Sequence, residues 1–245
     1  MKKAVIITGA SSGIGKATAL LFASHGYFVF LAGRNEARLV EVAEHCSAGA
    51  SLLKIDFEKE DSVQKYAHHI FERKDVKLVS LINNAGIFSS ELFADSDLSI
   101  WKKMMQVNLF GPQLLTQIVA KELIKNQGSI VNVSSTLGRK PTANTGAYSA
   151  SKSAMNSWTQ SLAAELGPFG VRVNAVLPGI VDTPIHSFHQ SPQKDKIVDH
   201  MGKLQPLGRI GKAEEIAQTI YFLSSEQSSW TTGALFDVDG GISLT

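Results

Sequence analysis

The stretch KAVIITGASSGIGKATALLFASH, residues 3–25, places a strand, a glycine-rich turn and a helix in direct succession. Residues 3–8 are apolar on both faces, which is typical of a central parallel strand. The turn TGASSGIG, residues 8–15, lets the backbone approach a pyrophosphate at the start of the helix 16–25, where free N–H groups favour an anion. The alternative is that this is a tight turn without a ligand. The position of the turn between a strand and a helix favours dinucleotide binding.

A second stretch, GSIVNVSSTLGRKPTANTGAYSASKSA at residues 128–154, reads as a strand, a polar loop and a helix with ionisable side chains. Tyr148 and Lys152 stand at i and i+4, so they share one helix face. A phenol titrates near pH ~10, and a fixed ammonium beside it favours the phenolate. We therefore expect Lys152 to lower the pKa of Tyr148 and make it a usable proton donor and acceptor. A hydroxyl at the strand end, on Ser134 or Ser135, would bind the same substrate oxygen, and such a trio suits carbonyl–alcohol chemistry.

Composition limits the class of protein. The 245 residues fit one large domain or two small ones, and the continuous α/β pattern favours a single domain over 1–245. A net charge of +2 without a basic cluster predicts no binding to nucleic acid or to a membrane surface. Cys46, the single cysteine, cannot form an intrachain disulfide and agrees with a cytoplasmic location. The first apolar run is too short for a signal peptide, and no stretch approaches the roughly 18 apolar residues of a membrane span.

The end of the second strand, residues 27–32, bears on the choice of cofactor. In dinucleotide folds an acid at this place binds the ribose 2′-hydroxyl and disfavours a 2′-phosphate. Here Gly33 stands in that place and Arg34 follows, and a guanidinium suits a phosphate. We therefore expect a preference for NADP(H). The alternative is that Arg34 is a solvated loop charge and that NAD(H), or both cofactors, are used.

Strands and helices alternate along the rest of the chain. Further strands are expected at 51–55, 76–82, 130–133, 171–177 and 235–238, and helices at 36–46, 59–73, 97–125, 148–166 and 213–224. Asp56 would meet the adenine or cap the next helix. The run NNAG at 83–86 would let a ribose approach, or its asparagines would stitch neighbouring strands. Asn108 precedes Gly111-Pro112, which should bend the helix; its amide would satisfy freed carbonyls, lie near Lys152, or both.

Residues 185–208 are irregular and mixed in composition, and we predict a mobile substrate lid there. The three histidines in this region are spaced too irregularly for a metal site, and no metal is expected: His186, His189 and His200. The residues expected around the substrate mix apolar and polar types, so the substrate does not follow from them: Phe88, Gly138, Arg139, Asn144 and the segment 185–205. Arg139 would meet an acidic substrate or be solvated.

In this order and spacing, the motifs resemble the classical short-chain dehydrogenase/reductase family over essentially the whole chain. They are TGxxxGIG at 8–15, NNAG at 83–86, Asn108, Ser135, Tyr148-x-x-x-Lys152, and Pro178-Gly179 with Thr183. The resemblance implies a Rossmann-like α/β fold, a doubly wound sheet of about seven mostly parallel strands with helices on both faces. It selects Ser135 over Ser134, because the family places its serine thirteen positions before the tyrosine. Within the family the chain is most similar to the 3-oxoacyl-acyl-carrier-protein reductase type.

The resemblance also implies an oxidoreductase that transfers hydride between a nicotinamide and a carbonyl or secondary alcohol. Ser135 would hold the carbonyl oxygen, Tyr148 would donate the proton, Lys152 would hold the ribose, and Asn108 would position a water that reprotonates the lysine. The turn lacks the basic residue that some NADP(H) members carry, so phosphate selection would rest on Arg34 with Ser11 and Asn35. The expected cofactor-binding residues are Gly9, Ser11, Ser12, Gly13, Ile14, Gly15, Arg34, Asn35, Asp56, Phe57, Asn84, Ala85, Gly86, Tyr148, Lys152, Pro178, Gly179, Val181 and Thr183.

Two further expectations concern the class and the assembly of the protein. A rival hypothesis is a non-catalytic NADP(H)-binding sensor on the same fold, but the intact trio of Ser135, Tyr148 and Lys152 argues against it. The apolar faces of the helices 98–125 and 148–166 suggest a homo-oligomer, and the family commonly forms tetramers through them. A tetramer or a dimer is therefore expected, and the direction of the reaction stays open.

Overall fold

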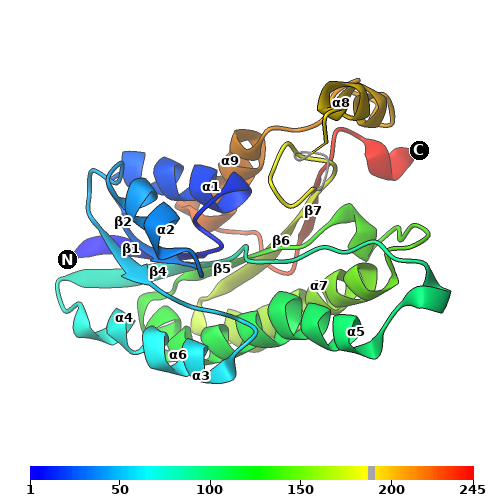
Figure 1. Ribbon diagram of the computed structural model, residues 1–245. Coiled ribbons are helices and arrows are strands. Elements are labelled where there is room, and N and C mark those ends of the chain that lie inside the picture. Colours follow the sequence, from blue (N-terminus) through cyan, green and yellow to red (C-terminus); the bar gives the residue numbers. More distant parts are fainter. Residues whose placement is uncertain (187–190) are drawn as a thin grey trace.

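The computed structural model, which describes residues 1–186 and 191–245, is built on one parallel sheet with helices on both faces (Figure 1). The strands are β1 (Lys2–Thr8), β2 (Phe28–Ala32), β3 (Ala50–Leu53), β4 (Val76–Asn83), β5 (Ser129–Val133), β6 (Arg172–Pro178) and β7 (Leu235–Val238). Their order is β3-β2-β1-β4-β5-β6-β7, and each neighbouring pair runs parallel. This confirms the predicted doubly wound α/β fold.

The helices come between the strands along the chain. They are α1 (Gly13–Ser24), α2 (Glu36–Ala43), α3 (Glu60–Ala67), α4 (His69–Glu72), α5 (Leu98–Met105), α6 (Gly111–Asn126), α7 (Gly146–Leu166), α8 (Lys194–Lys203) and α9 (Ala213–Ser224). Successive strand residues point to opposite faces, so Ile6 and Phe30 pack in one core layer and Ile7 and Leu31 in the other. Helices α3, α6 and α7 cover the first layer, and α1, α2 and α9 cover the second (Figure 1). The strands are apolar on both faces because helices bury them from both sides.

The segment expected as one bent helix, 97–125, is built from three pieces. Helix α5 ends at Met105, a π-helical turn spans Gln106–Phe110, and α6 begins at Gly111. Pro112 lies in the first turn of α6 and has no N–H to donate to the carbonyl four residues before it. Gly111 and Pro112, which predicted a bend, thus follow a π-helical turn, and such turns often occur at functional sites.

Two other segments differ from the sequence prediction. The helix expected at 59–73 is divided into α3 and α4 at His68. The segment 185–208 was predicted to be irregular, and this is wrong for its second half, which contains α8. Ile197 and Met201 stand one helical turn apart in α8 and both line the large cavity described below. His189 lies outside the described residues.

The direction in which strands are added to the sheet reverses at β1. This strand pairs with β2 on one side and with β4 on the other. Loops that follow two such strands leave toward opposite faces of the sheet and open a crevice at its carboxyl edge. The glycine-rich turn after β1 and the NNAG run at the end of β4 therefore meet at this crevice.

The described part of the chain contains neither a candidate membrane span nor a candidate metal cluster. None of its helices is both long enough and apolar enough to cross a membrane. Within 1–186 and 191–245, His, Cys, Asp and Glu side chains form no group of three or more that could hold a metal ion.

Candidate active site

The turn after β1 is shaped for close approach by a ligand. Gly9 and Gly13 have φ angles of +65° and +52°, in the left-handed region that favours glycine. A Cβ on Gly15 would lie 2.3 Å from the carbonyl oxygen of Gly9 and 2.5 Å from Nδ2 of Asn84. Helix α1 begins at Gly13, and the first N–H groups of a helix have no partner within it. The turn therefore forms a cradle that suits a pyrophosphate and that side chains would fill.

Thr8 and Asn84 fasten this cradle to the end of β4. Thr8 Oγ1 accepts hydrogen bonds from the backbone N–H groups of Asn84 and Ala85, each at 2.9 Å. Asn84 Nδ2 donates to the carbonyl oxygen of Thr8 at 2.8 Å. Asn83 is fully buried, and its amide donates to side chains of α6 and β5. Both asparagines thus stitch neighbouring elements, as one of the two sequence interpretations had it, while Asn84 also lines the cavity.

One cavity of about 1050 Å³ runs along the carboxyl edge of the sheet. It brings together nearly all the predicted site residues: Gly9, Ser11, Ser12, Gly13, Ile14, Arg34, Asn35, Asp56, Phe57, Asn84, Ala85, Gly86, Ser135, Tyr148, Lys152, Pro178, Gly179, Val181 and Thr183. Gly15 and Asn108 stand directly behind its wall, against Gly9 and Gly86. The glycine cradle and the hydroxyls of Ser135 and Tyr148, which line the same cavity, fit a nicotinamide dinucleotide.

The segment after β2 forms the end of the cavity that would take the adenosine. Arg34 Nη1 lies 3.0 Å from Glu58 Oε1, and the arginine side chain is 60% exposed. Asn35 caps α2, with its Oδ1 accepting a hydrogen bond from a backbone N–H at 3.1 Å. Asp56 Oδ1 accepts from the N–H of Glu58 at 3.2 Å, ahead of α3, which begins at Glu60. Asp56 therefore sets the turn before that helix and lines the cavity, and its side chain is not the helix cap.

The two serines after β5 have different partners. Ser134 Oγ donates to the carbonyl oxygen of Lys152 at 3.2 Å and so braces α7. The side chain of Ser135 hydrogen-bonds Tyr148, and its Oγ accepts from a backbone N–H at 3.2 Å. The ring of Phe88 meets the Tyr148 ring edge to face, with centroids 4.9 Å apart. The phenol is thus held between an aromatic wall and the Ser135 hydroxyl.

Lys152 and Tyr148 are both buried, and burial decides their titration. Lys152 Nζ donates to the carbonyl oxygen of Val133 at 2.8 Å and lies 5.7 Å from the centre of the Tyr148 ring. Burial lowers the pKa of Lys152 to about 8. Burial raises the pKa of Tyr148 to about 12, against a smaller lowering by the hydrogen bond with Ser135. The expected lowering of the Tyr148 pKa by Lys152 is therefore wrong for the free protein, because loss of hydration outweighs a cation that faces a carbonyl.

Asn108 lies in the π-helical turn and ties three elements together. Its Oδ1 accepts from the N–H of Ile87 at 2.9 Å, and its Nδ2 lies 3.0 Å from both the Ile87 carbonyl oxygen and Ser151 Oγ. A Cβ built on Gly86 would lie 3.4 Å from Asn108 Oδ1 and 3.5 Å from Lys152 Nζ. The amide thus satisfies a loop rather than helix carbonyls, and the interpretation that placed it near Lys152 is the better one.

The lowered pKa of Lys152 predicts how the stability of the free protein depends on pH. Between the folded pKa of about 8 and an unfolded value near ~10.4, the unfolded chain binds more protons, so the unfolding free energy rises with pH. Relative to Lys152→Met, the wild-type free energy of unfolding should rise by about 2 kcal/mol from pH 8 to pH 10. Urea denaturation of both proteins across this range measures the difference. Parallel curves would show that Lys152 keeps an ordinary pKa.

The end of the cavity expected to take the substrate has mostly apolar walls. Its walls include Phe88, Leu137, Thr142, Thr145, Ile185, His186, Ile197, Met201 and Leu204. Of the residues expected here, Gly138, Arg139 and Asn144 are not among the described residues that line it. Arg139 Nη1 lies 2.5 Å from Asp237 Oδ2, and its Nη2 donates to a β7 carbonyl oxygen at 3.1 Å. It braces β7 and stays 42% exposed to solvent, away from the cavity, so the solvated interpretation describes it better than a role toward an acidic substrate.

Sequence reasoning missed three contributors to the site. Thr8 and Ser151 were passed over although each stands inside a motif, next to Gly9 and Lys152. Their hydroxyls hold Asn84 and Asn108 in place. Glu58, the partner of Arg34, follows Asp56 by two residues, but the pairing of two loops distant in sequence left no local signal.

Comparison with known proteins agrees with this geometry. A family model described as Enoyl-(Acyl carrier protein) reductase, of the short-chain dehydrogenase/reductase type, matches residues 9–243. The chain is 36% identical to a 3-oxoacyl-[acyl-carrier-protein] reductase FabG of Thermotoga maritima, over 98% of this chain and 97% of that protein. It is 35% identical to an NAD-dependent glycerol dehydrogenase of Listeria innocua, over 99% and 94%.

A solved structure leads to the same family. The aldohexose dehydrogenase of Thermoplasma acidophilum superposes with a TM-score of 0.89 at 32% identity, covering 100% of this chain and 95% of that one. These relatives are named reductases or dehydrogenases, which does not favour the non-catalytic sensor. The chain therefore belongs to the short-chain dehydrogenase/reductase family and is an oxidoreductase that acts on CH–OH or C=O groups.

Proposed function

We propose that the protein transfers hydride between NADP(H) and a carbonyl or secondary alcohol, with Ser135, Tyr148 and Lys152 as its catalytic residues and Asn108 as their partner. One observation carries the proposal: Tyr148, paired with Ser135, opens onto the same cavity as the glycine cradle. A nicotinamide that extends from the cradle would lie beside the phenol. When bound, that group supplies and accepts the hydride.

The side chains have separate tasks in this mechanism. Ser135 and Tyr148 donate hydrogen bonds to the carbonyl oxygen, and Tyr148 passes its proton to that oxygen as the alcohol forms. The phenol carries its proton at neutral pH, since its pKa lies near 12. The phenolate left behind is buried, and the Lys152 ammonium compensates its charge. Asn108 positions the water that returns a proton through Lys152, a role supported by the approach of Asn108 Oδ1 and Lys152 Nζ to the same residue, Gly86.

Arg34 supports the preference for NADP(H). Its guanidinium stands at the cavity end expected for the adenosine ribose, where no acid follows β2 directly. The NAD-dependent relative shows that this family includes the other cofactor, so the preference needs a direct test.

Arg34→Asp should reverse the cofactor preference. We expect the Kd for NADPH to rise by about a hundredfold, because a charge-assisted contact becomes a repulsion, while the Kd for NADH stays within about threefold. Fluorescence titration of the purified protein with both cofactors measures this. An unchanged ratio would show that Arg34 is not the selector.

For the substrate we propose a 3-oxoacyl thioester or a similar ketone. The apolar walls of the substrate end and the similarity to reductases of that name support this class. NADPH oxidation against a panel of ketoacyl thioesters, simple ketones and sugars tests it, and turnover on sugars alone would transfer the assignment to the aldohexose type. Binding without turnover on any carbonyl would favour the sensor.

We propose that residues 1–245 act as one domain, that 185–208 is a substrate lid, and that the protein works in the cytoplasm as a homo-oligomer, a tetramer or a dimer. Phe110, 49% exposed beside α6, supports an interface there. Light scattering at working concentration would contradict the last proposal if it gave the mass of a monomer.

A further inference from the structure

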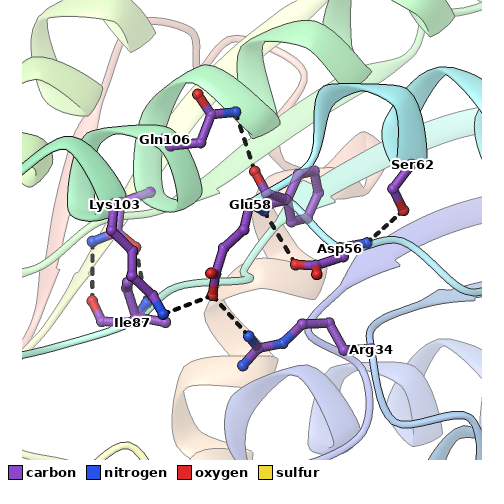
Figure 2. Close-up of polar contacts among 9 residues, drawn as sticks. Arg34, Asp56, Glu58, Ser62, Ile87, Lys103 and Gln106 are labelled. Carbon is purple, nitrogen blue, oxygen red and sulfur yellow. Dashed lines mark hydrogen bonds and ion pairs between the residues drawn. The ribbon is translucent and has the colours of Figure 1, made fainter. Parts of the chain in front are cut away.

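The residue proposed to bind the 2′-phosphate already has a carboxylate partner. Arg34 Nη1 and Glu58 Oε1 are 3.0 Å apart, and the same oxygen lies 3.0 Å from Lys103 Nζ (Figure 2). The three charges come from separate elements: Arg34 follows β2, Glu58 follows β3, and Lys103 stands on α5. One carboxylate oxygen is thus shared by two cations at the adenosine end of the cavity.

The backbone around Glu58 keeps its carboxylate within reach of Arg34. The N–H of Glu58 donates to Asp56 Oδ1 at 3.2 Å, and the N–H of Asp56 donates to Ser62 Oγ at 2.9 Å. The carbonyl oxygen of Phe57 accepts from Gln106 Nε2 at 3.2 Å (Figure 2). The 56–58 turn is therefore hydrogen-bonded to α3 through Asp56 and to the π-helical turn through Phe57. Glu58 is 30% exposed, less than either of its partners.

A guanidinium bound to one anion is a weaker receptor for another. A 2′-phosphate that reaches Arg34 would have to displace the Glu58 carboxylate or share the guanidinium with it, and two anions so close repel each other. A ribose 2′-hydroxyl carries no charge, so it neither has to displace the Glu58 carboxylate nor is repelled by it. Glu58 would therefore weaken the binding of NADP(H) and leave the binding of NAD(H) unchanged.

We propose that Glu58 sets the balance between NADP(H) and NAD(H) by competing with the 2′-phosphate for Arg34, and that Lys103 moderates this competition by holding the same carboxylate from α5. The proposal rests on the role of Arg34 in the proposed function. It makes Glu58 and its second cation, Lys103, act in opposite directions on cofactor preference. Loss of the carboxylate should favour NADP(H), and loss of Lys103 should disfavour it, because Glu58 would then have Arg34 as its single close cation among the described residues.

Calorimetric titration of the whole protein with NADP⁺ and NAD⁺ at low ionic strength tests this without relying on turnover. For Glu58→Gln we expect the Kd for NADP⁺ to fall by about fivefold, in line with the loss of one exposed ion pair, and the Kd for NAD⁺ to stay within about twofold. Glu36→Gln is the matched control. It removes the same charge from the start of α2, where Glu36 pairs with Lys54 at 3.1 Å and not with Arg34. It should change neither Kd by more than about twofold.

Arg34→Ala separates failure of this inference from failure of the proposed cofactor. If Arg34→Ala leaves the Kd for NADP⁺ unchanged, the cofactor assignment falls and this inference with it. If it weakens NADP⁺ while Glu58→Gln behaves like Glu36→Gln, the assignment stands and the competition is refuted. The competition is supported if Glu58→Gln strengthens NADP⁺ in the wild type but has no effect in the Arg34→Ala background.

Lys103→Gln tests the second half of the proposal. We expect the Kd for NADP⁺ to rise by about twofold to threefold in the wild type, and to stay unchanged in the Glu58→Gln background. A rise of equal size in both backgrounds would mean that Lys103 acts on the phosphate directly, which would overturn its moderating role.

Discussion

Tyr148→Phe should bind the cofactor as the wild type does and lose about a thousandfold or more in kcat. The phenyl ring keeps the edge-to-face contact with Phe88, so the wall of the cavity stays in place. What disappears is the hydroxyl that hydrogen-bonds Ser135 and that would give its proton to the carbonyl oxygen. General acid catalysis contributes about 10²–10⁴-fold, and no other phenol lines this cavity in the described part of the chain.

Steady-state kinetics on the best carbonyl of the panel, together with a cofactor titration, measures this loss. Tyr66→Phe is the control, because it removes a phenol hydroxyl from α3, away from the cavity, and should leave kcat unchanged. Turnover retained by Tyr148→Phe would overturn the assignment of the proton donor. A simultaneous loss of cofactor binding would show that the hydroxyl is needed for binding rather than for chemistry.

Gly15→Ala should have the second largest effect, on cofactor affinity and on stability together. Its Cβ would lie 2.3 Å from the carbonyl oxygen of Gly9 and 2.5 Å from Asn84 Nδ2, closer than real Cβ contacts allow. The turn must therefore open, which moves the N–H groups that are proposed to bind the pyrophosphate. We expect the Kd for NADPH to rise by about a hundredfold, as expected for the loss of one or two hydrogen bonds to a charged group. Overpacking should also lower the unfolding free energy by about 1–3 kcal/mol.

Gly167→Ala provides the matched control for this substitution. Gly167 has a helical φ of −54°, and no atom lies within 4 Å of an added Cβ. It should therefore bind NADPH with wild-type affinity and be no less stable. Titration and urea denaturation of both variants give the two readouts. Wild-type affinity in Gly15→Ala would show that the cradle does not hold the cofactor.

Local sequence patterns were sufficient for the strands and for most of the site. The alternation of strands and helices predicted an α/β domain, and the apolar run at 3–8 predicted a central parallel strand buried on both faces. The complete parallel sheet was implied by the family resemblance. Residues of the motifs that follow β1, β4, β5 and β6 line one cavity, because the carboxyl ends of parallel strands meet at one edge of the sheet. Helix details were less accessible: the π-helical turn at Gln106–Phe110 and helix α8 depend on packing against other elements.

The sequence by itself predicted the fold class, which the structure confirms, and the trio of Ser135, Tyr148 and Lys152, which stays a prediction. Both depend on residue types at short, regular spacing. Only the tertiary structure decided in which direction the pKa values of Tyr148 and Lys152 shift. Spacing predicted that Lys152 lowers the pKa of Tyr148, whereas burial of both groups sets values of about 8 and about 12. The pairing of Arg34 with Glu58, and of Arg139 with Asp237, is likewise visible only in the tertiary structure. Charges and hydration act across space, so their balance depends on which loops the fold brings together, and that information lies in no single stretch of the chain.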